Sequence, residues 1–435
     1  MRFMKEKLPK HKFTRLLRIL GPGLITGAAD DDPSGIATYS QTGAQFGYGQ
    51  LWTIFLMYPL MTAVQEACAR IGAVTGKGIA TVVKLNYSKK LLYFVVFLVV
   101  VANTINIGAD IGAMASATQL IFPVPFTILA LSFTIFMLIL EIFTSYITYA
   151  RILKWLAIGL IAYPITAFMA GQNWEEVLKA TFIPHIEFNT SFFFILTGVL
   201  GTTITPYMFF WQASEEVEEE ISQKILPKAN SIPKIGKAFI RNLRIDTAIG
   251  MFVSQVTTWF IIITTASVLH GGGINNITTA ADAAKALEPL VSTFPNSGFL
   301  AKVIFSFGII GLGLLSVPVL AGSASYALSE AFQWKEGLYL KFKQAHGFYG
   351  IITLATLIGL FINFVGIDPI QALVFTAVFN GIAAVPLVFI IGKIASSDKI
   401  MGEYKSGFWS KTLIWITFGA MFASSFALII SILFH

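Results

Sequence analysis

The chain has very few residues that could build a soft-metal or redox site. A single cysteine, Cys68, excludes an intramolecular disulfide and any cluster of thiolate ligands. The histidines lie between hydrophobic segments or near their ends, so no imidazole cage is predicted. They are His11, His185, His270, His346 and His435. We therefore expect no resident cofactor.

Charged residues are also scarce. They make up 12% of the chain, against 55% hydrophobic residues, and the mean hydropathy is +0.74. A soluble fold would need about a dozen buried helices of ~20 residues in one domain, which exceeds ordinary helix lengths. Apolar runs of membrane-spanning length recur instead, so we predict an all-α polytopic membrane protein. Residues 1–19 are basic and lack a signal-peptide cleavage site, which indicates a cytoplasmic tail.

A requirement of ~20 residues per span predicts eleven membrane-spanning segments. They cover residues 20–49, 50–70, 91–120, 126–148, 152–171, 191–213, 245–269, 297–329, 347–366, 369–394 and 411–434. Lysine and arginine favour alternate connections, which indicates a cytoplasmic N-terminus and an outside C-terminus. The net charge of +7 follows from this bias rather than from a nucleic-acid surface. We expect an integral protein of a bacterial-type plasma membrane, with the lipid bilayer around it and no obligate protein partner.

One run of negative charge, SEEVEEE at residues 214–220, follows the sixth segment. The simpler interpretation is a solvated helix end. The alternative is a vestibule that attracts cations.

Two predicted spans are interrupted at a proline. The first contains GAADDDPSGIA (27–37) and the sixth contains GTTITPYMFFW (201–211). Proline disfavours helical geometry in the residue before it, so Asp32 and Thr205 each lie at a predicted break. Unwound backbone at membrane depth must line a cavity or be buried in protein. Breaks at equivalent places in two halves, 20–171 and 191–394, predict an inverted-repeat transporter with a site near the midplane.

Three consecutive aspartates cannot face one site from a regular helix, because successive residues point ~100° apart. Each ionised carboxylate costs at least ~2.5–3.5 kcal/mol inside a membrane, which makes it a functional candidate. We predict that Asp32 contacts a bound cation and that Asp30 and Asp31 face a water-filled approach. The alternative places all three at an interface outside the bilayer. It is disfavoured because residues 16–29 are too few to span alone and a helical pattern resumes at Ile36.

The same stretch resembles the Nramp divalent-metal transporters. The resemblance rests on GPGLITGAADDDPSGIATYSQTGAQFGYGQLW and GAVTGKGIA, and further on RNLRIDTAIG, DAAKALEPL and VPLVF. It is greatest to the Nramp-related magnesium transporters, a side branch of that family. The resemblance implies a LeuT-type fold, with ten spans in two inverted repeats plus an eleventh, and transport rather than enzymatic activity.

The resemblance also implies a set of metal ligands. In that family the metal is held by the aspartate and asparagine of Asp-Pro-Gly-Asn, the methionine of Met-Pro-His, and nearby carbonyls. Carried over, the aspartate is Asp32 and the carbonyl belongs to Thr202. Gly35 stands in place of the asparagine, and Thr205 in place of the methionine. Asn380 is the nearest match to a tenth-span glutamine, unless it only pairs helices.

These two departures predict a preference for hard cations. A thioether favours transition metals, whereas carboxylate, carbonyl, hydroxyl and water suit Mg²⁺, Ca²⁺ and Mn²⁺. Gly35 removes a ligand and makes room, which suits a partly hydrated Mg²⁺ because this ion sheds water reluctantly. We therefore expect transported Mg²⁺, and also Mn²⁺. The alternative, that Met208 supplies a sulfur one turn after Thr205, is disfavoured because Pro206 fixes the register.

Proton coupling, which the resemblance would imply, lacks its usual groups. The family uses a histidine after the sixth-span proline, acids in the third span and arginines in the ninth. Here the histidine is replaced by Tyr207, whose phenol does not titrate near neutral pH. The ninth span has no arginine, and Asn106 and Ala109 replace acids, which leaves Asp110 as the carboxylate of that stretch. We predict that Tyr207 and Asp110 line the ion pathway; the alternative for Tyr207 is a packing role alone. We predict uncoupled import, for which −100 mV supplies a divalent ion about 4.6 kcal/mol, enough for over a thousandfold accumulation.

Three other functions were considered, and two of them stay open. One is proton-coupled transport of Mn²⁺ or another transition metal. A second is symport of an organic solute by the same fold, although Asp32 would repel an anionic substrate. An intramembrane aspartyl protease is not supported, because the aspartates lack the Tyr-Asp and Gly-x-Gly-Asp contexts of such enzymes.

Overall fold

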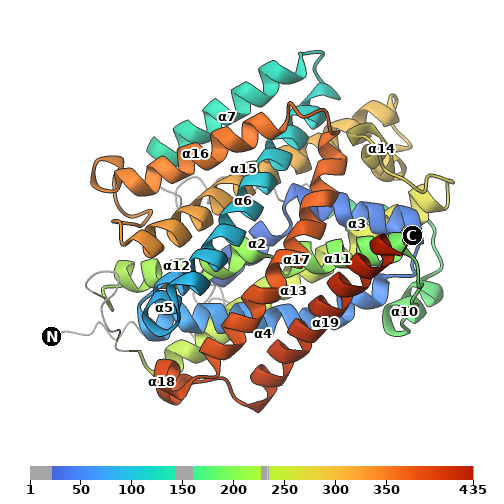
Figure 1. Cartoon of the computed structure of the whole chain (residues 1–435). Helices are drawn as coiled ribbons and strands as arrows, with labels where there is room; N and C mark the ends of the chain where they lie inside the picture. The colour runs from blue at the N-terminus through green and yellow to red at the C-terminus, as the bar shows by residue number, and fades with distance from the viewer. Residues whose placement is uncertain (1–21, 144–159, 227–232, 234, 435) are drawn as a thin grey trace, which may run out of the picture.

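The computed structural model describes residues 22–143, 160–226, 233 and 235–434. The predicted tail 1–19, the end of the fourth span and most of the first half of the fifth lie outside these residues. The described residues form helices and contain no strand (Figure 1), so the all-α prediction is confirmed. Seven helical segments in these ranges are long and apolar enough to cross a membrane.

Helices lie at all eleven predicted segments. The first half contains α2 (Pro22–Asp30), α3 (Pro33–Phe46), α4 (Leu51–Thr75), α6 (Lys89–Gln119), α7 (Phe126–Phe143) and α9 (Ala162–Met169). The second half contains α11 (Thr190–Thr203), α12 (Pro206–Ser222), α13 (Lys237–Thr265), α15 (Ser297–Phe332), α16 (His346–Ile362), α17 (Pro369–Ala395) and α19 (Phe408–Leu433). Short helices join them: α5 (Ile79–Asn86), α10 (Trp174–Phe182), α14 (Ala280–Ala284), α18 (Asp398–Met401) and the π-helix η2 (Ala266–His270).

The two halves pack in a reciprocal way. Helix α2 of the first span packs on α13 of the seventh, and α12 of the sixth packs on α4 of the second. Likewise α4 packs on α13, and α6 packs on α15. Exchanging each span with the one five places later preserves these contacts, as expected for inverted repeats. The broken helices therefore run through the interior of the bundle (Figure 1). The repeat boundaries 20–171 and 191–394 stay a prediction.

Helices α2 and α13 approach each other at two glycines of α2. A Cβ at Gly27 would lie 2.7 Å from Gly250 Cα, and one at Gly23 would lie 2.6 Å from Thr247 N. The Gly23 amide also donates a hydrogen bond of 2.7 Å to Asp246 Oδ2. This close approach holds the N-terminal and central parts of α2 against α13.

We expect Gly27→Ala to lower the stability of the protein by about 1–3 kcal/mol, because the added methyl group would overpack this contact. The measurement is the melting temperature of the purified protein in detergent. Gly350→Ala is the matched control, since a Cβ at this exposed position of α16 would meet no atom within 4 Å. We expect the control to be neutral or slightly stabilising. Equal melting temperatures for the two variants would contradict the close contact.

Candidate metal site

The first span breaks where the proline predicts. Helix α2 ends at Asp30, and α3 begins at Pro33. Asp32 is the N-cap of α3 and has extended backbone angles, with φ −68° and ψ 171°. A proline suits the first position of a helix, where its missing N–H would have no helical partner. The break predicted at Asp32 is confirmed.

The sixth span breaks in the same manner. Helix α11 ends at Thr203, and α12 begins at Pro206 with Thr205 as its N-cap, at φ −89° and ψ 138°. The Ile204 amide donates to Leu200 O at 2.9 Å. The remaining carbonyls of α11, including that of Thr202, come after Leu200 in the chain. Such carbonyls have no partner within their own helix and are available to a ligand.

The carboxylate of Asp32 accepts three hydrogen bonds from donors of its own. Ser34 Oγ and Gly35 N donate to Oδ1 at 2.6 and 2.8 Å. Asn106 Nδ2 donates to Oδ2 at 2.9 Å. The Tyr207 hydroxyl has one proton to share between Asp32 Oδ2 at 3.4 Å and Ala29 O at 3.2 Å, so a position on Oδ2 stays open to a cation. Asp32 is 1% exposed and lies at the positive N-terminal end of α3, which also stabilises its charge.

Gly35 lies against this cluster, with three side chains close to its Cα. A Cβ added to it would lie 3.2 Å from Tyr39 Cε2, 3.4 Å from Thr202 Oγ1 and 3.6 Å from Asp32 Oδ1. Ser34 Oγ is 3.3 Å from Thr202 Oγ1 across the two broken spans. The structure therefore brings Asp32, Gly35 and Thr202 together.

Two further predicted residues carry buried polar atoms without a hydrogen bond. They are Thr205 Oγ1 and Asn380 Nδ2, and both residues are at most 1% exposed. Asn380 precedes Gly381 of α17, whose Cα would lie 2.6 Å from a Cβ at Gly201, so Asn380 is level with the end of α11. The alternative for Asn380 was a hydrogen bond to a neighbouring helix, and its Nδ2 makes none to any described residue.

Helix α6 contributes two buried polar residues, Asn106 and Asp110. Asp110 Oδ2 accepts a hydrogen bond of 2.6 Å from Ser316 Oγ of α15, and Asp110 Oδ1 has none. Asn106 Oδ1 is likewise buried without a hydrogen bond. Asn106 was not among the predicted site residues. It could have been found from its spacing of four residues from Asp110, which puts both side chains on one face of α6.

Asp30 and Asp31 lie between α2 and α13. They are 0% and 3% exposed, and both are within hydrogen-bond distance of Ser254 Oγ, at 2.8 and 3.1 Å. The water-filled approach predicted for them is absent from this conformation, because protein atoms of the two helices enclose them. A role in the ion pathway stays a prediction.

The acidic run on α12 is not a solvated helix end, so that interpretation is wrong. Glu216 and Glu220 are 3% and 0% exposed. Glu218 accepts hydrogen bonds from the Tyr326 hydroxyl and from Leu338 N, the latter at 2.6 Å. The physical reason is that α15 and the segment after it cover this end of α12.

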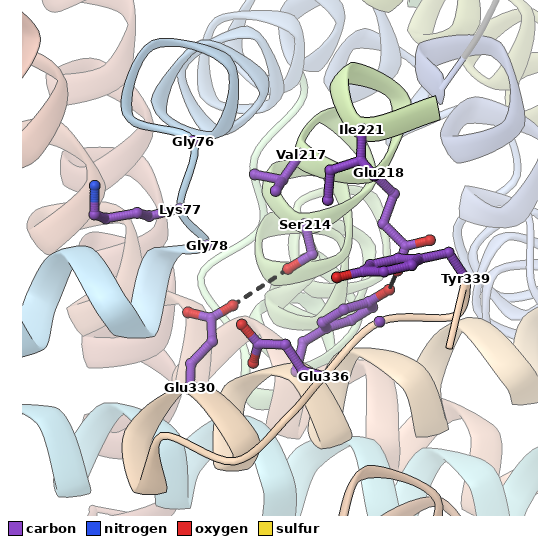
Figure 2. Close-up of a pocket in the computed structure, with 12 residues that line it drawn as sticks. Gly76, Lys77, Gly78, Ser214, Val217, Glu218, Ile221, Glu330, Glu336 and Tyr339 are labelled. Atoms are coloured by element: carbon purple, nitrogen blue, oxygen red, sulfur yellow. Dashed lines mark hydrogen bonds between the residues drawn. The ribbon is translucent and has the colours of Figure 1, made fainter. Parts of the chain in front are cut away.

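Figure 2 shows the pocket that results, with Glu218, Glu330 and Glu336 around it. Its cavity volume is small, about 20 Å³. Ser214 Oγ donates to Glu330 Oε1 at 3.4 Å, and Thr81 N donates to Glu330 Oε2 at 2.7 Å. Burial, with the nearby Glu330 and Glu218 carboxylates, raises the pKa of Glu336 above its usual range. The pocket lies beyond Ser214 on α12 and is separate from the Asp32 cluster.

The donor atoms around Asp32 are oxygen and nitrogen atoms. Met208 belongs to a buried hydrophobic cluster that includes Trp211, Leu315 and Phe348. In the described part of the chain, no group of three acidic, histidine or cysteine side chains is arranged so that it could hold a metal ion. A cation at the break would thus be held by Asp32, neutral oxygen atoms and water.

Comparison with curated proteins gives relatives that match almost the whole chain. The divalent metal cation transporter MntH of Staphylococcus haemolyticus is 26% identical, over 92% of this chain and 89% of the relative. MntH of Bacillus subtilis is 25% identical, over 93% of this chain and 90% of the relative.

Solved structures share the fold. A manganese transporter of Eremococcus coleocola has a TM-score of 0.75 at 17% identity, covering 98% of this chain and 88% of that one. Mhp1, a nucleobase-cation-symport-1 family transporter, has a TM-score of 0.57 at 13% identity, covering 95% and 92%. These likenesses confirm the predicted LeuT-type fold.

The family match carries the identification. Residues 23–431 match the family described as natural resistance-associated macrophage protein-like. This range covers nearly all of the 435 residues, including both broken spans. The protein therefore belongs to the Nramp family.

Proposed function

We propose that this protein imports divalent metal cations, preferentially Mg²⁺ and also Mn²⁺, without proton coupling. The observation that carries the proposal is the oxygen-lined break around Asp32, where Thr205 and Gly35 stand in place of a thioether and an amide. The relatives named above are divalent metal cation transporters, and one matched structure is a manganese transporter. Nramp proteins are transporters, so the chain is not an enzyme.

The metal preference follows from the ligands at the two breaks. Thr205 offers a hydroxyl that forms no hydrogen bond, and Met208 packs among hydrophobic side chains. Without a thioether, the site has no soft ligand that would favour transition metals over Mg²⁺. Gly35 adds no side-chain ligand, so water that Mg²⁺ keeps would complete its coordination. Asn380 is proposed as a further neutral ligand.

The absence of coupling follows from what surrounds Asp32. Its Oδ2 lies within hydrogen-bond distance of the Asn106 amide and the Tyr207 phenol. Neither group exchanges protons near neutral pH. Asp110 is hydrogen-bonded to Ser316 and not to Asp32, although its carboxylate lies close enough to interact with the charge of Asp32. Helix α16 contains no arginine or acidic residue. The driving force is then the membrane potential, with the N-terminus in the cytoplasm and the C-terminus outside.

Two alternatives use the same fold. Proton-coupled transport of Mn²⁺ or another transition metal matches the relatives' names, and symport of an organic solute matches the fold of Mhp1. The first would need a titrating relay at Asp32, and the second would need a larger site.

We expect proteoliposomes that contain the protein to take up Mg²⁺ and Mn²⁺ with no change in lumenal pH. Uptake should grow with an inside-negative potential, because each divalent ion gains about 4.6 kcal/mol per 100 mV. The measurement compares Mg²⁺, Mn²⁺ and Ca²⁺ uptake while a pH-sensitive dye reports the lumen, with protein-free liposomes as control. Acidification that tracks uptake would refute uncoupled transport. Strong Mn²⁺ uptake with no Mg²⁺ flux would refute the hard-ion preference.

A further inference from the structure

The pair Asp30 and Asp31 receives few hydrogen bonds. Among the described residues, their donors are Ser254 Oγ, shared at 2.8 and 3.1 Å, and Thr258 Oγ1, 3.5 Å from Asp31 Oδ1. A serine hydroxyl has one proton and can satisfy only one of the two carboxylates at a time. Asp30 Oδ1 is buried and has no hydrogen bond. The pair therefore has far more acceptor positions than donors.

Asp30 and Asp32 lie at opposite kinds of helix end. Asp32 starts α3, where the helix dipole is positive, and Ser34, Gly35 and Asn106 each donate a hydrogen bond to its carboxylate. Asp30 ends α2, where the dipole is negative and the last carbonyls lack helical partners. No ion pair between described residues involves Asp30 or Asp31. The end of α2 thus repels anions and attracts a cation.

A buried neutral side chain on the same face of α2 also lacks a hydrogen-bond partner. Thr26 precedes Asp30 by one turn of α2, on the face that also carries Gly23 and Gly27 against α13. It is 0% exposed, and its Oγ1 forms no hydrogen bond. Leaving a buried hydroxyl unsatisfied costs about 1–3 kcal/mol, which a bound hydrated ion would recover.

We propose that Asp30, Asp31, Ser254 and Thr258 form a second cation site, between α2 and α13, for a hard divalent cation such as Mg²⁺ or Mn²⁺. Two carboxylates balance a charge of +2, and every donor is an oxygen atom, as these ions prefer. The site adjoins Asp32 along the chain, so it gives the ion a second resting place. Several weak sites in series let an ion both enter and leave. This inference rests on the proposed function.

Calorimetric titration of the purified full chain with Mn²⁺ tests the site. We expect Asp32→Asn to bind one Mn²⁺ per chain, and Asp30→Asn/Asp31→Asn/Asp32→Asn to bind none. Adding Ser254→Ala to Asp32→Asn should weaken binding about tenfold, the usual effect of losing one polar contact of about 1.4 kcal/mol. Asp32→Asn/Glu141→Gln is the control and should bind like Asp32→Asn. Glu141 is also a buried carboxylate, 5% exposed, but lies on α7, which packs on α6 and α16.

Three outcomes would overturn the site, in distinguishable ways. If the wild type binds Mn²⁺ and Asp32→Asn does not, Asp32 holds the ion alone and the proposed function stands. If the triple variant binds Mn²⁺ as well as Asp32→Asn does, the ion lies elsewhere. If the wild type neither binds nor carries divalent ions, the proposed function fails and takes this site with it. A melting curve of each variant identifies any that is unfolded.

Discussion

Replacing Asp32 by asparagine is expected to lower Mg²⁺ and Mn²⁺ uptake by more than about a hundredfold. A unit charge ~4 Å from a cation charge contributes about 4 kcal/mol at an effective dielectric constant of ~20. The substitution removes this attraction from the centre of the broken spans. Asparagine still offers an oxygen to Ser34 and Gly35, so we expect the fold to persist. The measurement is initial uptake into proteoliposomes at equal protein density.

Glu141→Gln provides the matched control for Asp32→Asn. It also removes one buried carboxylate from a membrane helix, yet Glu141 lies on α7, away from the broken spans. We expect its uptake to equal that of the wild type. Wild-type uptake by Asp32→Asn would show that the first break does not bind the transported ion.

Restoring the soft ligands, by Gly35→Asn with Thr205→Met, is expected to shift selectivity toward Mn²⁺ over Mg²⁺ by about tenfold or more. A tenfold shift corresponds to about 1.4 kcal/mol. The thioether would favour the transition metal, and the amide would fill the space near Thr202 Oγ1 and Asp32 Oδ1. The nearest obstacle is Tyr39 Cε2, at 3.2 Å from the new Cβ, so Tyr39 must move by a few tenths of an ångström.

The measurement for this double variant is the ratio of Mn²⁺ to Mg²⁺ uptake in competition. Each single substitution, and Gly350→Ala as a distant glycine control, should be measured beside it. A selectivity ratio unchanged from the wild type in a folded double variant would mean that residues 35 and 205 do not contact the ion.

The two breaks could be predicted from sequence because proline acts on its immediate neighbours. Pro33 and Pro206 each start a helix in the structure, and Asp32 and Thr205 each precede one. The helical spans followed in the same way from their length and hydrophobicity. Local chemistry was sufficient for these features.

The partners of the aspartates could not be predicted, because they depend on contacts between distant segments. Asn106 is 74 residues from Asp32, and Ser254 is 224 residues from Asp30. Composition identifies neither pairing, since both partners are common polar residues of membrane helices. The acidic run on α12 was misjudged for a similar reason. Its burial comes from α15 and the segment around Leu338, more than a hundred residues later in the chain.

The hydrogen bonds to Asp32 bear on how the transport cycle closes. A uniporter must return to its starting orientation with nothing bound, whereas a carrier that cannot do so works only as an exchanger. An unoccupied aspartate without donors would oppose that return, because its charge would cross the protein interior unsolvated. Ser34, Gly35 and Asn106 each donate to the Asp32 carboxylate, so protein groups can solvate its charge. Under the proposed function, these donors favour net uptake over one-for-one exchange.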